Sequence, residues 1–293
     1  MEQETLLACI LCGDSGIEAA DRENNLGRCR ACGAVFESPR PSQQAIISFY
    51  SQPGQYGSWV EEERARNRLW RRRLAKLENH RKPGSLLDIG TGIGQFLAVA
   101  KKSFTEVTGT EVSTSAIAIA REKYALEVLH GQAEDMDFGG RTFDNITLFH
   151  VLEHVLSPKR LLEKCRGLLT TGGVLTIAVP NDIASLGAVK RRLQARLGSG
   201  SGGPQGVFGL PRLTLDGSMD EIHLSHFTEP VLAKYLAGAG FGILESSLDP
   251  FYAATGPRLF KMHCIYRMFS LVKRVTGVNL YGTIWICARK NQQ

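Results

Sequence analysis

The fold is decided by residues 86–97, which read LLDIGTGIGQFL. A short apolar run leads into Asp88, three glycines follow at alternate positions, and a helical pattern begins behind them. Glycine has no Cβ, so it adopts positive φ readily and lets the backbone approach a ligand closely. Such a turn lies at the carboxyl end of the first strand of an open α/β sheet, where these sheets bind ligands. The dinucleotide pattern G-x-G-x-x-G is excluded, because Gln95 stands where its third glycine would fall.

Strand and helix patterns alternate from residue 84 onwards. This alternation predicts a doubly wound α/β fold built on a parallel sheet. Strands are expected at residues 85–89, 106–110, 126–129, 143–149, 174–179, 241–247 and 282–288. Helices are expected at residues 93–102, 114–123, 158–169 and 230–239.

Further motifs lie on this framework. They read HVLEH at 150–154, LLTTGG at 168–173, VPN at 179–181, HLSHFT at 223–228 and AGF at 239–241. Together with the D-x-G-x-G-x-G turn, they resemble the class I S-adenosylmethionine-dependent methyltransferases, especially the ubiquinone-biosynthesis-like group that modifies small molecules and sugars. The resemblance covers roughly residues 84–289. It implies a seven-stranded Rossmann-like sheet and a transferase that uses S-adenosylmethionine, and it says little about the acceptor.

The resemblance implies a cofactor site around the glycine turn. Asp88 would contact the methionine part of the cofactor, and Glu111 would accept hydrogen bonds from both ribose hydroxyls. Alternatively, Glu111 is a charge that suits a helix N-terminus. Gln132 replaces the family's usual aspartate near the adenine, where Ala133 or Glu134 would substitute. The expected cofactor-binding residues are Tyr50, Tyr56, Asp88, Gly90, Thr91, Gly92, Gly94, Glu111, Val112, Ala133, Glu134 and Phe149.

The candidate catalytic residues lie in the HVLEH motif. A hydroxyl acceptor needs a base within hydrogen-bond reach, and histidine suits that role at neutral pH. We expect His154 to be the base, with Glu153 orienting it or supplying an oxygen to a metal, and His150 beside them. Alternatively, His150 packs under the cofactor while Glu153 and His154 cap the following turn. His223 and His226 are further candidates, or have local structural roles.

The expected reaction is methylation of a hydroxyl on a small molecule or sugar. C-methylation of a keto-sugar and RNA methylation are alternative enzyme functions, and a scaffold protein with a vestigial pocket is the non-enzyme alternative. The chain lacks the N-P-P-[YF] tetrad that usually supports methylation of an exocyclic base amine. It also lacks a Pro-Cys nucleophile after residues 143–149.

Four cysteines have the spacing of a metal site. Cys9 and Cys12 form one C-x-x-C-G knuckle, and Cys29 and Cys32 form a second. Such a pair predicts a four-cysteine structural zinc site, because four thiolates leave no open position for catalysis. The remaining three cysteines are expected to be buried hydrophobic residues: Cys165, Cys264 and Cys287.

The domain organisation follows from these motifs. We expect a zinc ribbon at 1–41, a helical cap or linker at 42–83 and the methyltransferase domain at 84–293, with inserts at 181–227 and 250–279. The first insert contains GSGSGGP at 198–204 and is expected to be a lid or a disordered segment. In the cap, Tyr50 and Tyr56 would cover the cofactor, or pack the ribbon onto the main domain.

The net charge of +6 is modest and only weakly suggests a nucleic-acid partner. A basic helix pattern at 64–76 is expected to be a solvated face, with RNA binding as the alternative. In residues 258–274, basic and apolar side chains alternate; we expect core packing, with contact to a membrane surface as the alternative. No signal peptide and no apolar run of roughly 20 residues are evident, so a cytoplasmic location is expected.

Overall fold

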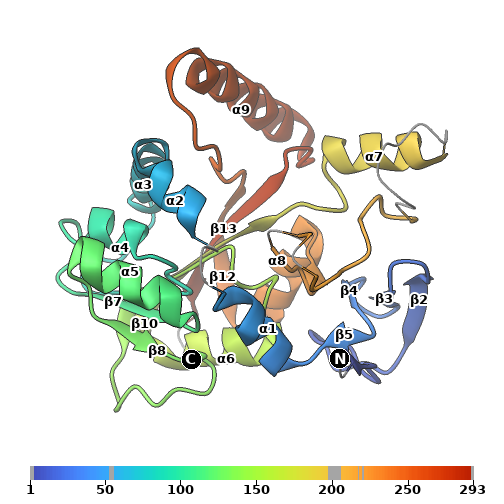
Figure 1. Cartoon of the computed structure of the whole chain (residues 1–293), viewed down its shortest axis with the longest axis horizontal. Helices are drawn as coiled ribbons and strands as arrows, with labels where there is room; N and C mark the ends of the chain where they lie inside the picture. The colour runs from blue at the N-terminus through green and yellow to red at the C-terminus, as the bar shows by residue number, and fades with distance from the viewer. Residues whose placement is uncertain (1–2, 53–55, 197–205, 217, 220, 292–293) are drawn as a thin grey trace.

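The computed structural model describes residues 3–52, 56–196, 206–216, 218–219 and 221–291. The glycine-rich stretch at 198–204, expected to be flexible, lies outside these residues. A twisted central sheet carries helices on both faces, and a small N-terminal module packs at one side (Figure 1).

The central sheet has seven strands in the order β12-β13-β10-β9-β6-β7-β8. Neighbouring strands from β10 to β8 are parallel, whereas β13 runs antiparallel to both β10 and β12. The chain leaves β6 in one direction to β7 and β8, and returns on its other side to β9 and β10. The crevice where the order reverses is where open α/β sheets bind ligands. The strands are β6 (Leu86–Ile89), β7 (Val107–Glu111), β8 (Val128–His130), β9 (Phe143–Phe149), β10 (Leu169–Pro180), β12 (Phe241–Ser247) and β13 (Thr283–Lys290).

Two apolar layers fix the helices to this sheet. On one face, Trp70, Phe96 and Trp285 belong to a buried cluster that joins helices α3, α4 and α5 to the strands. On the other face, a larger cluster joins α6 and α8 to the strands and to the N-terminal module. The helices are α3 (Glu63–Leu77), α4 (Gln95–Ala100), α5 (Thr114–Tyr124), α6 (Pro158–Leu168) and α8 (Glu229–Gly238).

These elements confirm the predicted fold class. Strands 143–149 and 241–247 match the expected bounds, and the other expected strands are displaced by a few residues or extended. β10 is the longest strand described, and it begins five residues before the expected start at Val174 and ends one residue later than expected.

The N-terminal module contains β1 (Gln3–Glu4), β2 (Ile17–Asp21), β3 (Leu26–Cys29), β4 (Val35–Glu37) and β5 (Arg40–Pro41). Its four-stranded sheet has the order β11-β4-β3-β2, and β11 (Ser225–His226) comes from the end of the 181–227 insert. The backbone amide of Glu37 also donates to the carbonyl of Leu224. The insert therefore returns to the module and completes its sheet before the chain enters α8.

Residues 42–83 form α1 (Gln43–Tyr50), α2 (Gly57–Glu61) and α3. The expectation of a solvated basic face on α3 is wrong for two arginines. Arg66 is buried, and Arg73 is completely buried in an ion pair with Asp249. Trp70 on the same helix is buried as well.

Both inserts contain a helix. α7 (Leu186–Arg196) lies in the first and α9 (Gly256–Thr276) in the second. The expected core packing of residues 258–274 is wrong, because no residue of α9 is buried. Cys264 on this helix is exposed rather than buried, whereas Cys165 and Cys287 are buried as expected.

Candidate functional site

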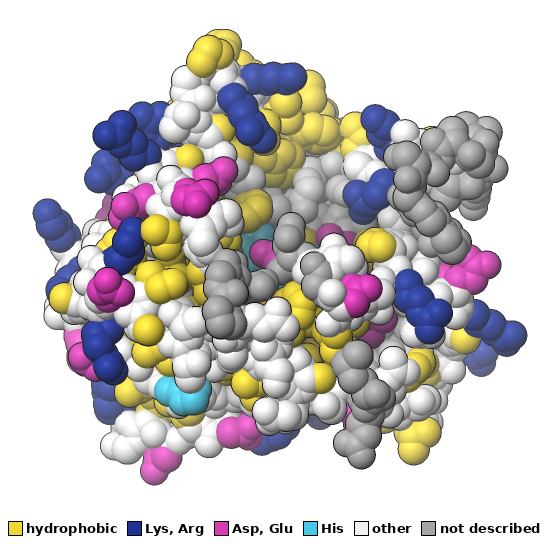
Figure 2. All heavy atoms as spheres, viewed as in Figure 1, with side chains coloured by type: hydrophobic (Ala, Val, Ile, Leu, Met, Phe, Trp, Pro, Cys, Tyr) yellow, Lys and Arg dark blue, Asp and Glu magenta, His cyan; other side chains and the backbone are white. Residues whose placement is uncertain are grey.

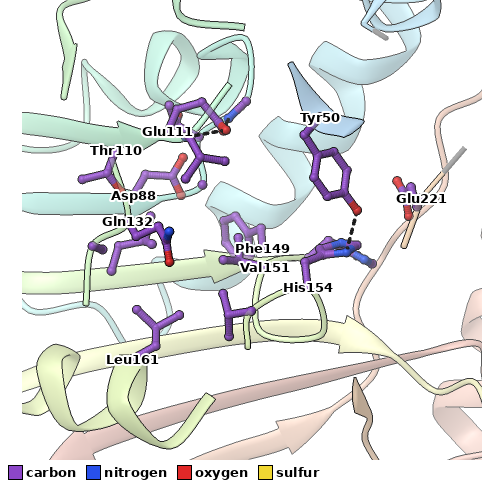
Figure 3. A pocket seen from close by; sticks show the side chains of 18 of the residues that line it. Tyr50, Asp88, Thr110, Glu111, Gln132, Phe149, Val151, His154, Leu161 and Glu221 are labelled. Carbon is purple, nitrogen blue, oxygen red and sulfur yellow. Dashed lines mark hydrogen bonds between the residues drawn. The ribbon is translucent and has the colours of Figure 1, made fainter. Parts of the chain in front are cut away.

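A cavity of about 1020 Å³ opens at the carboxyl ends of β6, β7 and β9. In Figure 3, Asp88, Glu111 and Gln132 lie at one end, and Tyr50 and His154 lie at the other. A volume of this size is at the upper end of small-molecule sites, so it offers room for more than one small ligand. Of the expected cofactor residues, these line it: Tyr50, Tyr56, Asp88, Gly90, Thr91, Gly92, Glu111, Val112, Ala133, Glu134 and Phe149.

The glycine turn at 88–94 lines the end of the cavity that contains Asp88 and Glu111. Gly92 has φ of +56°, and a Cβ built on it would lie 2.9 Å from the ring of Trp59. A side chain on Gly90 would come within 2.5 Å of Val151. Gly94 differs from these two: it precedes α4, and a Cβ there would meet Leu126 instead of the cavity.

Glu111 links the end of β7 to this turn. One carboxylate oxygen accepts from the amide of Gly92 at 2.8 Å, and the other accepts from Val112 at 2.8 Å and Ser113 at 3.0 Å. Burial raises the pKa of Glu111, while these three amide donors oppose the rise. The carboxylate therefore faces the cavity in a fixed orientation. The position agrees with the alternative of a charge near a helix N-terminus, because Ser113 is the N-cap of α5.

Asp88 lies at the carboxyl end of β6 and is buried. The hydroxyl of Thr147 on β9 donates to it at 2.6 Å, across the point where the strand order reverses. Burial raises the pKa of Asp88 to about 6, although this hydrogen bond and Arg73 favour the charged form. A buried carboxylate with a raised pKa favours a cation as its ligand.

Residues after β8 form another wall at the same end of the cavity as Asp88 and Glu111. Gln132, Ala133 and Glu134 line the cavity, and burial raises the pKa of the Glu134 carboxyl. The backbone amide of Gly131 donates to the carbonyl of Glu111, so this wall is attached to the end of β7.

The cap segment closes over the turn through Gln95. The side-chain oxygen of Gln95 accepts from Arg66 Nε at 2.9 Å and from Trp70 Nε1 at 3.2 Å. The side-chain NH₂ of Gln95 donates to the carbonyl of Trp59 at 3.0 Å. The Arg66 guanidinium stacks on the Trp59 ring at 3.9 Å, and burial lowers the pKa of Arg66 to about 10. The residue that breaks the dinucleotide spacing therefore holds α2 and α3 against the cofactor end of the cavity.

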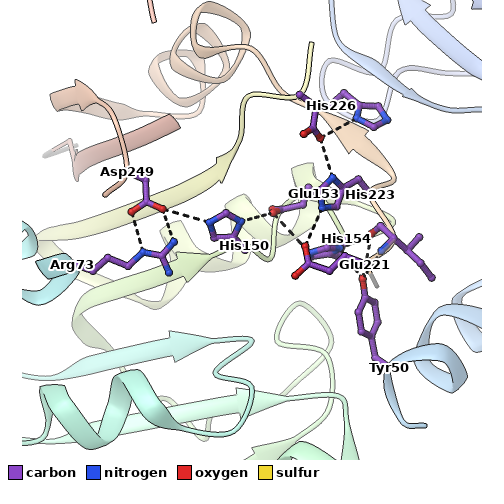
Figure 4. Close-up of polar contacts among 11 residues, drawn as sticks. Tyr50, Arg73, His150, Glu153, His154, Glu221, His223, His226 and Asp249 are labelled. Carbon is purple, nitrogen blue, oxygen red and sulfur yellow. Dashed lines mark hydrogen bonds and ion pairs between the residues drawn. The ribbon is translucent and has the colours of Figure 1, made fainter. Parts of the chain in front are cut away.

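His150 sits between two carboxylates (Figure 4). Its Nδ1 lies 3.3 Å from Glu153, and its Nε2 lies 3.4 Å from Asp249. Burial lowers the pKa of His150, but these two partners outweigh it and the net shift is upward. With a carboxylate at each nitrogen, His150 favours the doubly protonated cation and lacks the free lone pair of a base.

His154 has the opposite electrostatic balance. Its Nδ1 lies 2.9 Å from the Tyr50 hydroxyl and makes a short hydrogen bond to the carbonyl of Ile222. A carbonyl only accepts, so Nδ1 carries the hydrogen and Nε2 keeps its lone pair. Burial lowers the pKa of His154, and the nearby charge of His223 lowers it further, against the raising effect of Glu153. The surroundings of the two rings thus shift their pKa values in opposite directions, downward for His154 and upward for His150.

Glu153 lies behind these two histidines and is completely buried. Burial raises the pKa of its carboxyl, but the neighbouring rings of His154 and His150 outweigh burial and lower it. Neither of its oxygens has a hydrogen-bond partner within the geometric limits among the described residues. The carboxylate Oε1 is 3.8 Å from His154 Nε2, so its contact with that ring is electrostatic.

His223 and His226 lie on either side of Asp182, away from the lining of the cavity. Asp182 contacts His223 Nδ1 at 2.9 Å and His226 Nδ1 at 3.4 Å. Burial lowers the pKa of His223, but Asp182 and Glu221 outweigh it and raise the pKa to about 11. His226 also contacts Glu37 of the N-terminal module at 3.5 Å. These contacts with carboxylates connect the end of the first insert to the rest of the molecule, which agrees with the structural alternative.

The expected option of a metal oxygen at Glu153 has a geometric counterpart. Glu153, His154 and His223 each bring one ligand atom within 4.8 Å of the others. Both ring nitrogens of His223 already face carboxylates, however, and its raised pKa favours a proton on each. The group therefore presents two donors with free lone pairs instead of three.

The side chains of the four cysteines in the N-terminal module form one cluster. Their sulfur atoms lie within 4.8 Å of one another, with 3.5 Å between Cys9 and Cys32 and 3.6 Å between Cys12 and Cys29. A tetrahedral Zn–S₄ site with bonds of about 2.3 Å separates its sulfurs by roughly 3.8 Å. The cysteines form no disulfide, and their arrangement fits this ion.

Sequence reasoning missed several residues of the site, and two of them lie in the turn after β12. Asp249 follows β12 and holds both Arg73 and His150, while Phe251 lies against the His150 ring at 4.4 Å and lines the cavity. The turn after β12 carries no motif, so nothing in the sequence placed it beside the end of β9.

Comparisons with known proteins agree with this architecture. Residues 61–246 match a protein family described as "Methyltransferase domain". The demethylmenaquinone methyltransferase of Thermotoga maritima is 31% identical over 37% of this chain and 48% of its own. The ubiquinone biosynthesis O-methyltransferase of Coxiella burnetii is 32% identical over 33% and 43%. The chain thus spans about half the length of the curated relatives it matches.

Solved structures show the same fold. The plantazolicin methyltransferase BpumL in complex with SAH has a TM-score of 0.50 and 16% identity, covering 85% of this chain and 94% of its own. Since the family match spans more than half of the sequence and includes the glycine turn and the HVLEH motif, the chain belongs to the methyltransferase domain family.

Proposed function

We propose that the protein is an S-adenosylmethionine-dependent methyltransferase that methylates a hydroxyl group of a small molecule or sugar. One observation supports this most strongly: a single cavity has the glycine turn with Asp88 and Glu111 at one end and His154, whose pKa is lowered by burial, at the other. The cofactor would supply an electrophilic methyl group on a sulfonium centre.

The chain's own residues would divide the work. Asp88 would face the cationic methionine end of the cofactor, and the second lone pairs of Glu111 would accept from the ribose hydroxyls. Ala133 and Glu134 would flank the adenine. Placing the reacting atoms in line contributes about 7–11 kcal/mol to lowering such a barrier. α1 and α2 would exclude water by covering the cavity with Tyr50, Tyr56 and Trp59.

His154 would act as the base. Its Nε2 would accept the proton of the acceptor hydroxyl, while the Ile222 carbonyl and the Tyr50 hydroxyl hold the ring through Nδ1. Glu153 lies against the ring and would stabilise the imidazolium that forms. His150 would be a positioning residue, because its charge holds Glu153 and Asp249 in place.

The cysteine cluster would hold a structural zinc ion through Cys9, Cys12, Cys29 and Cys32. Cys9 and Cys29 belong to the same apolar cluster as α6 and α8, so a metal here would brace the module against the main domain. Such an ion adds about 10–16 kcal/mol of binding free energy to folding.

RNA methylation has less support from this geometry. Two arginines of the basic helix are buried among aromatic rings and a carboxylate, and are unavailable to phosphate. C-methylation of a keto-sugar would use the same histidine to remove a carbon-bound proton, and no observation favours it over a hydroxyl acceptor.

The test combines methyl-labelled S-adenosylmethionine with a panel of hydroxyl, keto and amine acceptors. Label appearing on a hydroxyl oxygen in the wild type and lost in His154→Ala supports the proposal. Transfer only to carbon or nitrogen contradicts the hydroxyl assignment. Failure of the wild-type protein to bind the cofactor contradicts the enzyme assignment.

A further inference from the structure

The most unusual surface of the molecule is the outer side of α9. This 21-residue helix contains no buried residue, although many of its side chains are apolar. Its inner side contacts the body through Tyr266, which donates to the Leu248 carbonyl, and through Lys273, which pairs with Glu229. Apolar side chains on the opposite side remain uncovered in the described part of the chain.

The uncovered side chains form one continuous stripe. Phe260, Cys264, Met268, Leu271 and Val275 follow each other at spacings of three and four residues, so they lie on a single face. Four of them have exposed fractions of 73% (Phe260), 53% (Met268), 62% (Leu271) and 77% (Val275). Figure 2 shows hydrophobic side chains gathered over this helix, at the top of the view.

Positive charge flanks the stripe. Lys261, Arg267 and Arg274 are exposed beside it, and the sequence of α9 contains no aspartate or glutamate. An apolar face bordered by lysine and arginine is the pattern of helices that lie in the plane of a membrane interface. Each basic side chain near an anionic lipid surface adds about fivefold to binding.

A second helix near the end of α9 also exposes apolar side chains. α7 exposes Leu186, Val189 and Leu193, and its described sequence also lacks acidic residues. Its first residue donates a backbone hydrogen bond to the carbonyl of Leu280 at 2.9 Å, just after the end of α9. Both helices lie along the upper edge of Figure 1. The start of α7 is thus attached to the segment that follows α9.

We propose that α9, extended by α7, binds to an anionic lipid surface. The apolar stripe would enter the interface, while Lys261, Arg267 and Arg274 contact lipid phosphates. A second copy of the chain explains the surface less well, because self-association would bring positive flanks together. No described helix is long and apolar enough to cross a membrane, so the contact is peripheral.

The consequence concerns the acceptor. Phe251, which lines the cavity, lies only a few residues before the start of α9. A helix held at the lipid surface would keep this wall of the cavity close to the membrane, where an acceptor with an apolar tail resides. This consequence, unlike the binding itself, depends on the proposed function.

The test is co-sedimentation of the full chain with phosphatidylcholine vesicles, with and without phosphatidylglycerol, in the absence of cofactor. Wild-type protein should bind only the anionic vesicles, and added salt should weaken binding. Arg267→Gln with Arg274→Gln should lower the partition coefficient about 30-fold. Met268→Ser with Leu271→Ser should lower it at least tenfold, since both changes lie on the exposed stripe.

Matched controls separate this outcome from misfolding. Lys101→Gln with Lys102→Gln removes two exposed charges elsewhere, and Leu129→Ser removes an exposed apolar side chain on β8. Both should bind vesicles like the wild type, and all variants should retain the same melting temperature. The proposal is overturned if wild-type protein ignores anionic vesicles or if the α9 variants bind unchanged. A wild-type dimer that Met268→Ser with Leu271→Ser dissociates, without vesicle binding, would identify a second copy as the occupant instead.

Discussion

Glu111 accepts a hydrogen bond from the backbone amide of Gly92 at 2.8 Å. The bond joins the end of β7 to the turn after β6, so two separate parts of the chain form one cradle. Because all three amide donors act on a buried carboxylate, its orientation is set before any ligand arrives. A carboxylate that is already fixed binds a sugar diol more tightly than a mobile one, because a mobile side chain loses conformational entropy on binding.

Cofactor binding should depend on pH through Asp88. Its pKa is raised to about 6 by burial, and an ammonium group beside it would lower that pKa in the complex. Affinity should therefore be constant above pH 6 and fall by up to tenfold per pH unit below it, as binding must release a proton. Calorimetry in buffers of different ionisation enthalpy measures that proton.

Asp88→Asn is the control for this effect, because asparagine has nearly the same side-chain shape as aspartate but no carboxyl group that titrates. The variant should bind more weakly at neutral pH and show no proton release. Equal proton release in the variant and the wild type would assign the titration to another group.

Much of this fold followed from local patterns. The strands at 143–149 and 241–247 and the turn at 88–94 are recognisable because buried strands and glycine turns leave compositional marks. The Arg73–Asp249 pair left none, because its two residues are distant in sequence. Residues 258–274 were recognisable by their basic and apolar side chains, but not as an exposed helix. A helix with basic and apolar residues at helical spacing has the same sequence pattern whether it is buried or exposed. Only the tertiary structure shows which of the two environments it has.

His154→Ala should slow methyl transfer about 10²- to 10⁴-fold while leaving cofactor affinity unchanged, because general-base catalysis is worth that much. In the wild type, kcat/KM should be flat at neutral pH and decline only below 6.5, since burial lowers the pKa of His154 from that value. His80→Ala, a histidine outside the cavity, should behave like the wild type. Unchanged turnover in His154→Ala would remove this residue from the chemistry.

Arg73→Leu should lower the free energy of unfolding by about 3–5 kcal/mol, because it leaves the buried Asp249 carboxylate without its cation. Arg71→Leu, an exposed arginine on the same helix, should change it by less than about 0.5 kcal/mol. Urea titration followed by circular dichroism measures both. A loss equal to that of Arg71→Leu would show that Arg73 does not support the site.

Purified protein should contain one zinc ion per chain by elemental mass spectrometry. Cys29→Ser should lose the ion and a large part of its stability, because structural zinc contributes about 10–16 kcal/mol to folding. Cys264→Ser, on the exposed face of α9, should keep both. Metal-free wild-type protein, or equal metal content in the two variants, would contradict the four-cysteine site.

The most direct test of the central claim is calorimetric titration of S-adenosylmethionine into the wild type and Glu111→Gln. The amide of glutamine cannot replace a carboxylate that accepts from three backbone amides and, in the proposed complex, would also accept from a sugar diol. We expect one binding site in the wild type and at least a tenfold loss of affinity in the variant, about 1.4 kcal/mol. Exposed Glu127→Gln should bind like the wild type. Absence of binding by the wild type, or equal affinity in Glu111→Gln, would contradict the account.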